Sequence, residues 1–451
     1  MNWTLRIKGL GNIVDEAIDI KQMTIVSGPD MISKQNIMNL LYTIKNMPFY
    51  KFNDKIEISE EYESHWDKIV KLHSKYVLNS NDKLFMVQLL NNWLDKAKYK
   101  IVQLALGTAE TIDGLAIEFN QEILDIALNV KPRPENDFLS VEKRYEVYWT
   151  IDGKDTAIYN MSESNTEYLD CIIKLLFDGL LGKCDLATNQ AVFVPACSAG
   201  VMATHKMVVS NTIKYVYSAE LESDDAYANN RSNLPIGVVD FMRMLATLRE
   251  PMEYKMYSAE QIEEKVLHGK VCVQTSPFIS IKFMPDGSDK TYPIEIMPAA
   301  IQSVASIVIA LRYSGINCNT IMIEDVGNHL DSVAQMELTK VLVGLTNSGM
   351  NIIMSTDSPY VICTLNNSMY AEYLVQKYTG DKKLKVLELP INRLRCDVSA
   401  YSVEEGQLYV TDRSEEFILD DNRIDKASEY INDIYYKLID IEFVKEDKKD
   451  E

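Results

Sequence analysis

Lys34 follows a short apolar strand and a glycine, and it precedes a stretch with helical periodicity. This arrangement can bind phosphate groups. The apolar stretch 23–27 ends at Gly28, and helical spacing begins at Ser33. The complete phosphate-loop pattern, G-x-x-x-x-G-K-[ST], would place a glycine at position 33 and a hydroxyl side chain at position 35. The chain has Ser33 and Gln35 there. The residues alone leave two interpretations: a drifted phosphate site, or a strand–turn–helix with a surface lysine.

Two acidic residues follow another apolar strand, in the segment "NTIMIEDVG". Glu324 and Asp325 come directly after this predicted strand. The strand ends after Ser27 and after Ile323 belong to the carboxyl edge of the predicted sheet, where open α/β folds bind ligands. A simpler interpretation is that the two acids favour the N-terminus of the helix that follows.

The elements that would position these residues alternate between strands and helices, which predicts a largely parallel sheet. The predicted fold class is therefore α/β, a mixed and largely parallel sheet with helices on both faces. Residues 1–47 and 190–451 are expected to form a head, with antiparallel strands near 270–297. Residues 48–189 are expected to form an inserted, mainly helical lobe with a hairpin near 143–160.

Composition narrows the classes of function. The 451 residues are 47% apolar, and no run of about 18 apolar residues predicts a membrane span. The net charge of −20 argues against nucleic acid binding by this chain alone. The seven cysteines are widely spaced without a CxxC pair, which favours reduced thiols, a cytoplasmic location and no zinc or haem site.

Five segments in order resemble the ATPase heads of the ABC/SMC-like superfamily, in particular the bacterial AAA-family ATPases related to the OLD-family heads. "LRIKGLGNIVDEAIDIKQMTIVSGPD" resembles the strands that lead into Walker A, and "AVFVPACSAGVM" resembles the central segment "PASRAG". "PIEIMPAAIQSVASIVIALRY" lies where the signature helix lies. "IMIEDVGNHLDSVAQMELTKVL" resembles Walker B with the D-loop, and "IIMSTDSPYVI" resembles the switch strand. This resemblance covers nearly the whole chain and implies a P-loop NTPase head of the ABC type.

The resemblance also implies a set of nucleotide-site residues. Glu324 and Asp325 stand at the positions of the acidic catalytic pair, with Asp325 in the place of the base. Mg²⁺ would be contacted by Gln35 and Glu324, although a glutamine is longer than the usual hydroxyl ligand. The positions that would contact ATP are Gly28, Ser33, Lys34, Gln35, Asn36 and Asp357.

Several of these positions depart from the family pattern. Asp357 stands where the family has a histidine beside the γ-phosphate. A carboxylate about 4 Å from a phosphate charge is repelled by roughly 4 kcal/mol at an effective dielectric constant near 20. Ala299 and Ala300 stand in place of the signature Ser-Gly, and Ser198 stands in place of a phosphate-pairing arginine. A simpler interpretation of Asp357 is that it caps the helix beginning at "SPYV".

These departures favour a pseudo-ATPase that acts as a scaffold or regulatory subunit, with weak or no ATP hydrolysis and weak binding of ATP and Mg²⁺ at most. The expected partners are a second copy of the chain, an active ATPase relative or an effector protein. The alternative is a slow ATPase that drives a separate effector, such as a nuclease or toxin in anti-phage defence, or that acts in DNA processing.

Overall fold

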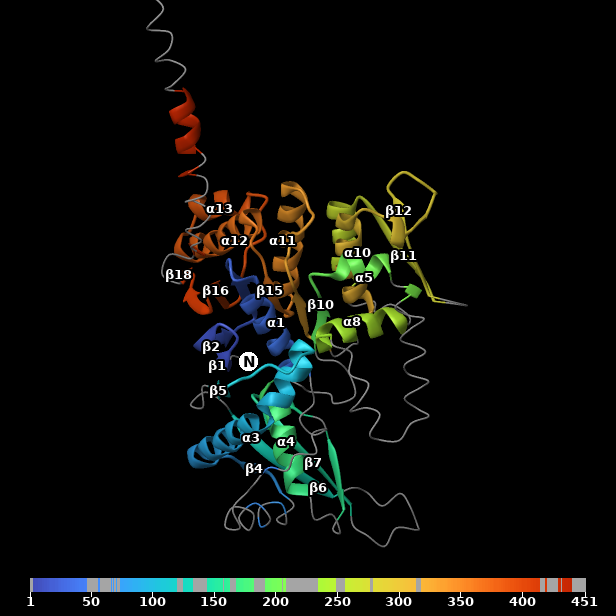
Figure 1. Cartoon of the computed structure of the whole chain (residues 1–451). Helices are drawn as coiled ribbons and strands as arrows, with labels where there is room; N and C mark the ends of the chain where they lie inside the picture. The colour runs from blue at the N-terminus through green and yellow to red at the C-terminus, as the bar shows by residue number, and fades with distance from the viewer. Residues whose placement is uncertain are drawn as a thin grey trace, which may run out of the picture.

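The computed structural model gives the chain a mixed α/β fold (Figure 1). The residues that the structure describes are 3–46, 56, 66, 68, 70, 74–119, 125–132, 144–156, 158–162, 168–181, 191–204, 206–207, 234–248, 256–275, 279–313, 318–413, 418–419, 429–430 and 432–439.

The central sheet has six strands in the order β10-β14-β15-β3-β16-β17, and it is parallel except for the last strand. Its strands are β3 (Met23–Ser27), β10 (Ala191–Val194), β14 (Thr320–Ile323), β15 (Asn351–Ser355), β16 (Val398–Glu404) and β17 (Gln407–Val410). The largely parallel sheet predicted from the sequence is therefore confirmed. Strands β14, β15 and β3 are neighbours, so the segments that follow them meet at one edge.

Two hydrophobic clusters cover the two faces of this sheet. Successive side chains of a strand point to opposite faces, and accordingly Ile25 of β3 belongs to one cluster and Val26 to the other. The cluster of Val26 includes residues of α1 (Met31–Asn46) and α3 (Ser80–Leu106). The cluster of Ile25 includes residues of the helices α8 (Ile236–Ala246), α9 (Met256–Ile262), α10 (Ala299–Tyr313), α11 (Ser332–Asn347) and α12 (Pro359–Lys377).

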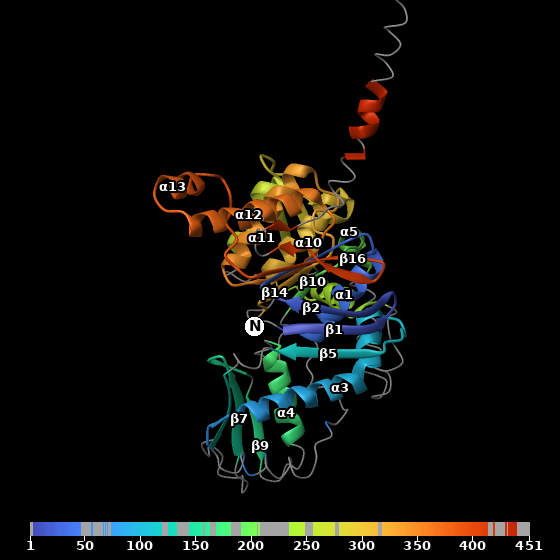
Figure 2. The ribbon, with the colours of Figure 1, turned by 90° about the vertical axis from the view of Figure 1, so that its left-hand side faces the viewer.

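A second sheet lies beside α1 and has the antiparallel order β2-β1-β5 (Figures 1 and 2). It is formed by β1 (Trp3–Leu10), β2 (Ile13–Ile20) and β5 (Gly114–Phe119). Although β5 comes from the range 48–189, it pairs along β1 from Trp3 to Lys8. A third antiparallel sheet, β11-β12-β13, occupies the range near 270–297 where antiparallel strands were expected; its strands are β11 (Gly269–Gln274), β12 (Ser280–Pro285) and β13 (Tyr292–Pro293).

The described part of residues 48–189 mixes helix and strand, and much of it lies below the head in Figure 2. Besides α3 and β5 it contains β4 (Tyr76–Val77), β6 (Ile126–Pro132), β7 (Arg144–Ile151), β8 (Lys154–Asp155), β9 (Tyr159–Ser162) and α4 (Tyr168–Leu180). The predicted hairpin is present, because β7 and β8 pair across a turn at Asp152 and Gly153, both with positive φ. The division into a head and an inserted lobe stays a prediction.

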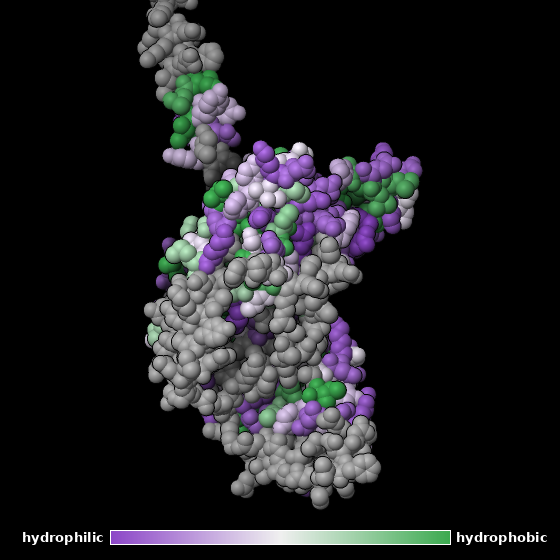
Figure 3. Space-filling model, turned by 90° about the vertical axis from the view of Figure 1, so that its right-hand side faces the viewer, coloured by the Kyte–Doolittle hydropathy of each residue, from purple (hydrophilic) through white to green (hydrophobic). Residues whose placement is uncertain are grey.

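Shorter elements complete the described chain. They are α5 (Ser198–Ala203), a π-helical turn η3 (Glu263–Leu267), a 3₁₀ turn η4 (Ile294–Ile296), α13 (Asp381–Leu387), β18 (Asp412–Arg413) and β19 (Ile418–Leu419). Helix α13 and the helical residues 432–439 project from the body, and Figure 3 shows hydrophobic and hydrophilic residues side by side on both. None of the helices in the described part of the chain combines the length and apolar character needed to cross a membrane.

Candidate functional site

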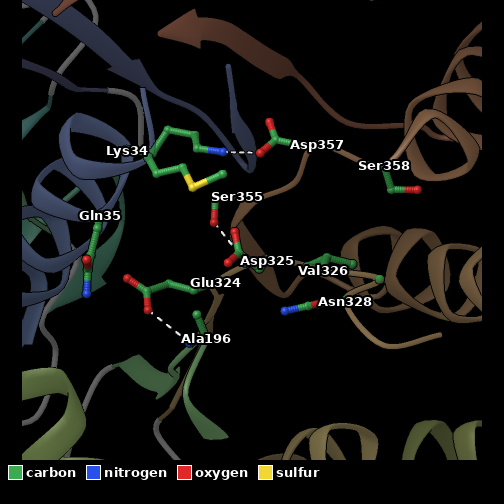
Figure 4. Close-up of a pocket in the computed structure, with 12 residues that line it drawn as sticks. Lys34, Gln35, Ala196, Glu324, Asp325, Val326, Asn328, Ser355, Asp357 and Ser358 are labelled. Carbon is green, nitrogen blue, oxygen red and sulfur yellow. Dashed lines mark hydrogen bonds and ion pairs between the residues drawn. The ribbon is translucent and has the colours of Figure 1, made fainter. Parts of the chain in front are cut away.

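A cavity of about 530 Å³ lies at the carboxyl edge of β3, β14 and β15 (Figure 4). Its volume falls in the range of small-molecule sites. Four acidic or basic side chains line it, and they come from the segments that follow these three neighbouring strands. The lining residues are Met31, Lys34, Gln35, Ala196, Glu324, Asp325, Val326, Gly327, Asn328, Ser355, Asp357 and Ser358.

The Asp357 carboxylate bonds to two groups of the predicted phosphate loop. Its Oδ2 pairs with the ammonium group of Lys34, and its Oδ1 accepts a hydrogen bond of 3.0 Å from the amide of Gly28 (Figure 4 shows the Lys34 pair). The Lys34 side chain is 4% exposed and that of Asp357 is 43% exposed. A backbone amide at the end of a strand and a lysine ammonium are the donors that a phosphate would use here. The carboxylate of Asp357 therefore takes the place of an anionic ligand.

The first turn of α1 is closed in the same way, by Asp30. Its Oδ1 accepts from the amide of Ser33 at 3.0 Å and its Oδ2 accepts from the Ser33 hydroxyl at 2.8 Å, which makes Asp30 the N-cap. Burial disfavours the charged form of Asp30, but bonds from Ser33, Asn12 and Gly406 together lower its pKa. The negative charge that stabilises this helix N-terminus is thus supplied by the protein.

Most backbone amides of the loop already have acceptors within the chain. Pro29 has no N–H to give. The other bonds run from Asp30 N to Val403 O at 3.2 Å, from Met31 N to Pro29 O at 3.0 Å, and from Lys34 N to Asp30 O at 3.0 Å. Together with the amides of Gly28 and Ser33, these bonds leave little of the loop for a phosphate to contact.

The hairpin of β16 and β17 holds the loop from the other side. The amide of Gly406, at the hairpin tip, donates to Oδ2 of Asp30 at 2.9 Å. Gly28 has φ +122°, and a Cβ at this position would lie 2.3 Å from the carbonyl oxygen of Val403. The close approach of loop and hairpin therefore requires glycine at position 28.

Glu324 lies deep in the cavity and is bound on both carboxylate oxygens. Oε2 accepts from the Ala196 amide at 3.0 Å, and Oε1 accepts from the side-chain amide of Asn39 at 3.3 Å. Burial raises the pKa of Glu324 to about 7, the Ala196 amide lowers it in part, and the charge of Asp325 raises it. Glu324 is therefore held near the midpoint of its titration at neutral pH.

Asp325 is held by its backbone. Its φ is +51°, a left-handed conformation that aspartate tolerates better than most residues, and its amide donates to Oγ of Ser355 at 2.9 Å. The amide of Val326 donates to the Ser355 carbonyl at 2.8 Å. Ser355 at the end of β15 thus fixes the turn that carries both acids.

The structure brings Lys34, Gln35, Glu324, Asp325 and Asp357 together around one cavity. Three other residues predicted from the resemblance do not line it. Gly28 contacts the cavity indirectly through Asp357, and Ser33 is buried against Asp30. Asn36 lies on another side of α1, where its side-chain amide is 3.6 Å from the position of a Cβ on Gly11.

The interpretation of Asp357 as a helix cap is wrong. Ser358 caps α12, because its Oγ accepts from the Val361 amide at 3.2 Å, and Ser358 also donates to Gln335. The side chain of Asp357 reaches β3 instead. Sequence reasoning also missed Asp30, although an aspartate directly before a helical stretch is a known N-cap signal.

The residues present do not fit an ATP triphosphate with Mg²⁺ in this arrangement. Lys34 faces a carboxylate, and three acidic side chains line the cavity against one lysine. Within the described residues, no three His, Cys, Asp or Glu side chains are grouped so that they could hold a metal ion. An incoming triphosphate would have to displace Asp357 before it could reach Lys34.

Neither a family model nor a curated protein matches the chain. Among solved structures, it is similar to an Smc head bound to the C-terminal winged-helix domain of ScpA, with 10% identity, a TM-score of 0.34, and coverage of 91% of this chain and 98% of that one. It is also similar to an Smc head with an extended coiled coil bound to a Pyrococcus furiosus ScpA domain, with 10% identity, a TM-score of 0.33, and coverage of 96% and 100%.

A third similar structure is the SMC head domain from Thermotoga maritima, with 8% identity, a TM-score of 0.29, and coverage of 90% and 97%. The structural similarity to SMC heads is thus distant. We base the function on the contacts of the site itself.

Proposed function

We propose that this chain is a pseudo-ATPase, a scaffold or regulatory subunit with an ATPase-like fold and weak or no binding of Mg-ATP. The observation that supports this most strongly is the double contact of Asp357 with Lys34 and with the Gly28 amide. A γ-phosphate near Asp357 would meet a repulsion of roughly 4 kcal/mol at 4 Å and a dielectric constant near 20. That is a loss of several hundred-fold in affinity, roughly.

The preserved core supports a role for the fold without turnover. The strands β3, β14 and β15 are almost fully buried, and hydrophobic clusters cover both faces of the sheet. Burial of apolar surface stabilises this sheet whether or not a nucleotide binds. A chain that loses phosphate contacts can therefore keep the surface by which it associates.

Exposed apolar residues at the rim of the cavity support action through association. Met31 and Ile32 in the first turn of α1 are 72% and 68% exposed, Val333 at the start of α11 is 61% exposed, and Tyr360 at the start of α12 is 52% exposed. These helices follow β3, β14 and β15, so their first turns lie at the same edge of the sheet. Large apolar side chains gathered at one face are typical of a protein interface.

The partner that this face fits best is a second copy of the chain, or a related head with a similar rim. A partner with an intact phosphate site would form the catalytic half of a mixed dimer. A separate effector, such as a nuclease or toxin in anti-phage defence, would then be controlled by the dimer.

Calorimetric titration of the purified chain with Mg-ATP tests this function, with Lys34→Ala beside the wild type. We expect no heat that depends on Lys34 up to millimolar ATP. Micromolar binding that vanishes in Lys34→Ala would instead favour the alternative, a slow ATPase that drives a separate effector. One observation favours that alternative: Lys34, Glu324 and Asp325 line one cavity.

Sedimentation velocity tests the scaffold role separately. A scaffold is expected to associate with the same affinity with and without Mg-ATP. Association that requires Mg-ATP would contradict the proposal, because it would mean that the nucleotide completes the interface.

A further inference from the structure

A second cavity, of about 510 Å³, lies at the opposite, amino edge of the central sheet. Its floor includes Gln22, Asn319 and Asn351, which stand just before or at the start of β3, β14 and β15. Its other wall comes from the β7–β8 hairpin and α4. The amino terminus of the chain lies in this region between sheet and lobe in Figures 1 and 2.

Three lysines from three separate elements line this cavity, against one aspartate, Asp397. Lys21 precedes β3, and its Nζ donates to the carbonyl oxygen of Val398 at 2.8 Å. Lys45 comes from the last turn of α1 and is 8% exposed. Lys154 lies exposed on β8. A local excess of positive charge is notable in a chain with a net charge of −20, because it opposes the field of the rest of the molecule.

The position of Lys45 is fixed by a contact between elements. Its Nζ donates to the carbonyl oxygen of Leu181, directly after α4, at 2.6 Å. A hydrogen bond to a carbonyl oxygen orients the ammonium group and leaves its charge in place. Burial of this charged group beside a cavity of ligand size is the feature that an anion would compensate.

The wall that carries Lys154 is closely packed. A Cβ on Gly179 of α4 would lie 2.5 Å from Thr156 and 2.8 Å from Ile151, so the helix and the hairpin touch at this glycine. Thr156 Oγ1 also accepts from the amide of Trp149 at 2.9 Å. The hairpin that presents Lys154 is therefore preorganised, which lowers the entropy cost of binding.

We propose that this cavity binds a small multivalent anion that carries phosphate or carboxylate groups. Lys21, Lys45 and Lys154 would neutralise the ligand, and the side-chain amides of Asn319 and Asn351 would supply neutral donors. The ligand would join the β7–β8 hairpin to the amino edge of the central sheet. This site is separate from the cavity of Asp357, which lies at the other end of the same strands.

Calorimetric titration of the full chain with inorganic pyrophosphate and with citrate tests the proposal. Lys154→Gln is the informative variant, because an exposed lysine can be replaced without disturbing the core. Lys290→Gln, another exposed lysine, is the matched control. We expect one or both anions to bind the wild type, with affinity about tenfold weaker in Lys154→Gln and unchanged in Lys290→Gln.

The two probes also separate the ligand chemistries. Tighter binding of pyrophosphate assigns phosphate chemistry, and tighter binding of citrate assigns carboxylate chemistry. No heat with either anion at millimolar concentration would overturn the proposal, and so would equal affinity in Lys154→Gln and the control. Binding that is lost in Lys34→Ala would place the anion at the carboxyl edge, and it would contradict this proposal and the pseudo-ATPase together.

Discussion

Asp357 forms an ion pair with Lys34, a residue 323 positions earlier in the chain, and so connects the segment after β15 with the helix after β3. The same carboxylate accepts from the Gly28 amide. One side chain thus satisfies both the charge and the backbone donor that a phosphate would bind. The site keeps its shape because its anion is part of the protein.

This ion pair is expected to couple Asp357 and Lys34 in stability. Asp357→Asn removes the carboxylate that faces a buried ammonium group, and Lys34→Met removes the ammonium group. Because Asp357 is 43% exposed, we expect a coupling energy of roughly 1 kcal/mol. Urea unfolding of the two single variants and the double variant measures it. Strictly additive effects would show that the pair does not form in solution.

Glu324 is expected to make stability depend on pH. Its pKa is raised from 4.5 to about 7 in the folded chain, mainly by burial. Between these two values the folded state binds more protons than the unfolded state, so the free energy of unfolding falls as the pH rises. Glu324→Gln is expected to reduce that fall by roughly 2 kcal/mol between pH 5 and pH 7.

Thermal or urea unfolding across this pH range checks the effect of Glu324. The exposed Glu388→Gln is the control and should leave the slope unchanged. An unchanged slope in Glu324→Gln would mean that Glu324 is ionised throughout the range.

Asp30 is expected to stabilise the loop more than a helix cap alone would. Asp30→Ala removes the N-cap of α1 and also the acceptor for the Gly406 amide. Asp331→Ala, which removes the N-cap of α11 from the amides of Val333 and Ala334, is the matched comparison. A cap alone contributes about 1 kcal/mol. Chemical denaturation should show a larger loss for Asp30→Ala, and equal losses would contradict the role of Asp30 in holding the hairpin.

The apolar rim of the cavity is expected to mediate association. Val333 is 61% exposed and Tyr360 is 52% exposed, so Val333→Glu and Tyr360→Glu should leave the fold intact and weaken self-association about tenfold or more. Sedimentation velocity over a range of concentrations measures this. The exposed Tyr257, on α9, is the control for a Tyr→Glu change. An unaffected dimer would move the interface elsewhere on the chain.

The central sheet could be predicted because its strands are short apolar runs separated by amphipathic helices, as in "NTIMIED" and "MNIIMST". The gathering of Lys34, Glu324 and Asp325 followed from the rule that ligands bind at the carboxyl edge of such sheets. The partner of Asp357 could not be predicted, because Asp-Ser-Pro fits a helix cap equally well from local sequence. The pairing of β5 with β1 was also missed, since it joins residues more than a hundred positions apart.

The most direct test of the closed phosphate loop is a Mg-ATP titration of Asp357→Asn, with the double variant Asp357→Asn, Lys34→Ala as its control. If the Asp357 carboxylate closes the loop, its neutral form should bind Mg-ATP about a hundredfold more tightly than the wild type. That gain should vanish in the double variant. If the wild type and Asp357→Asn show the same dependence on Lys34, the Asp357 carboxylate does not close the phosphate site.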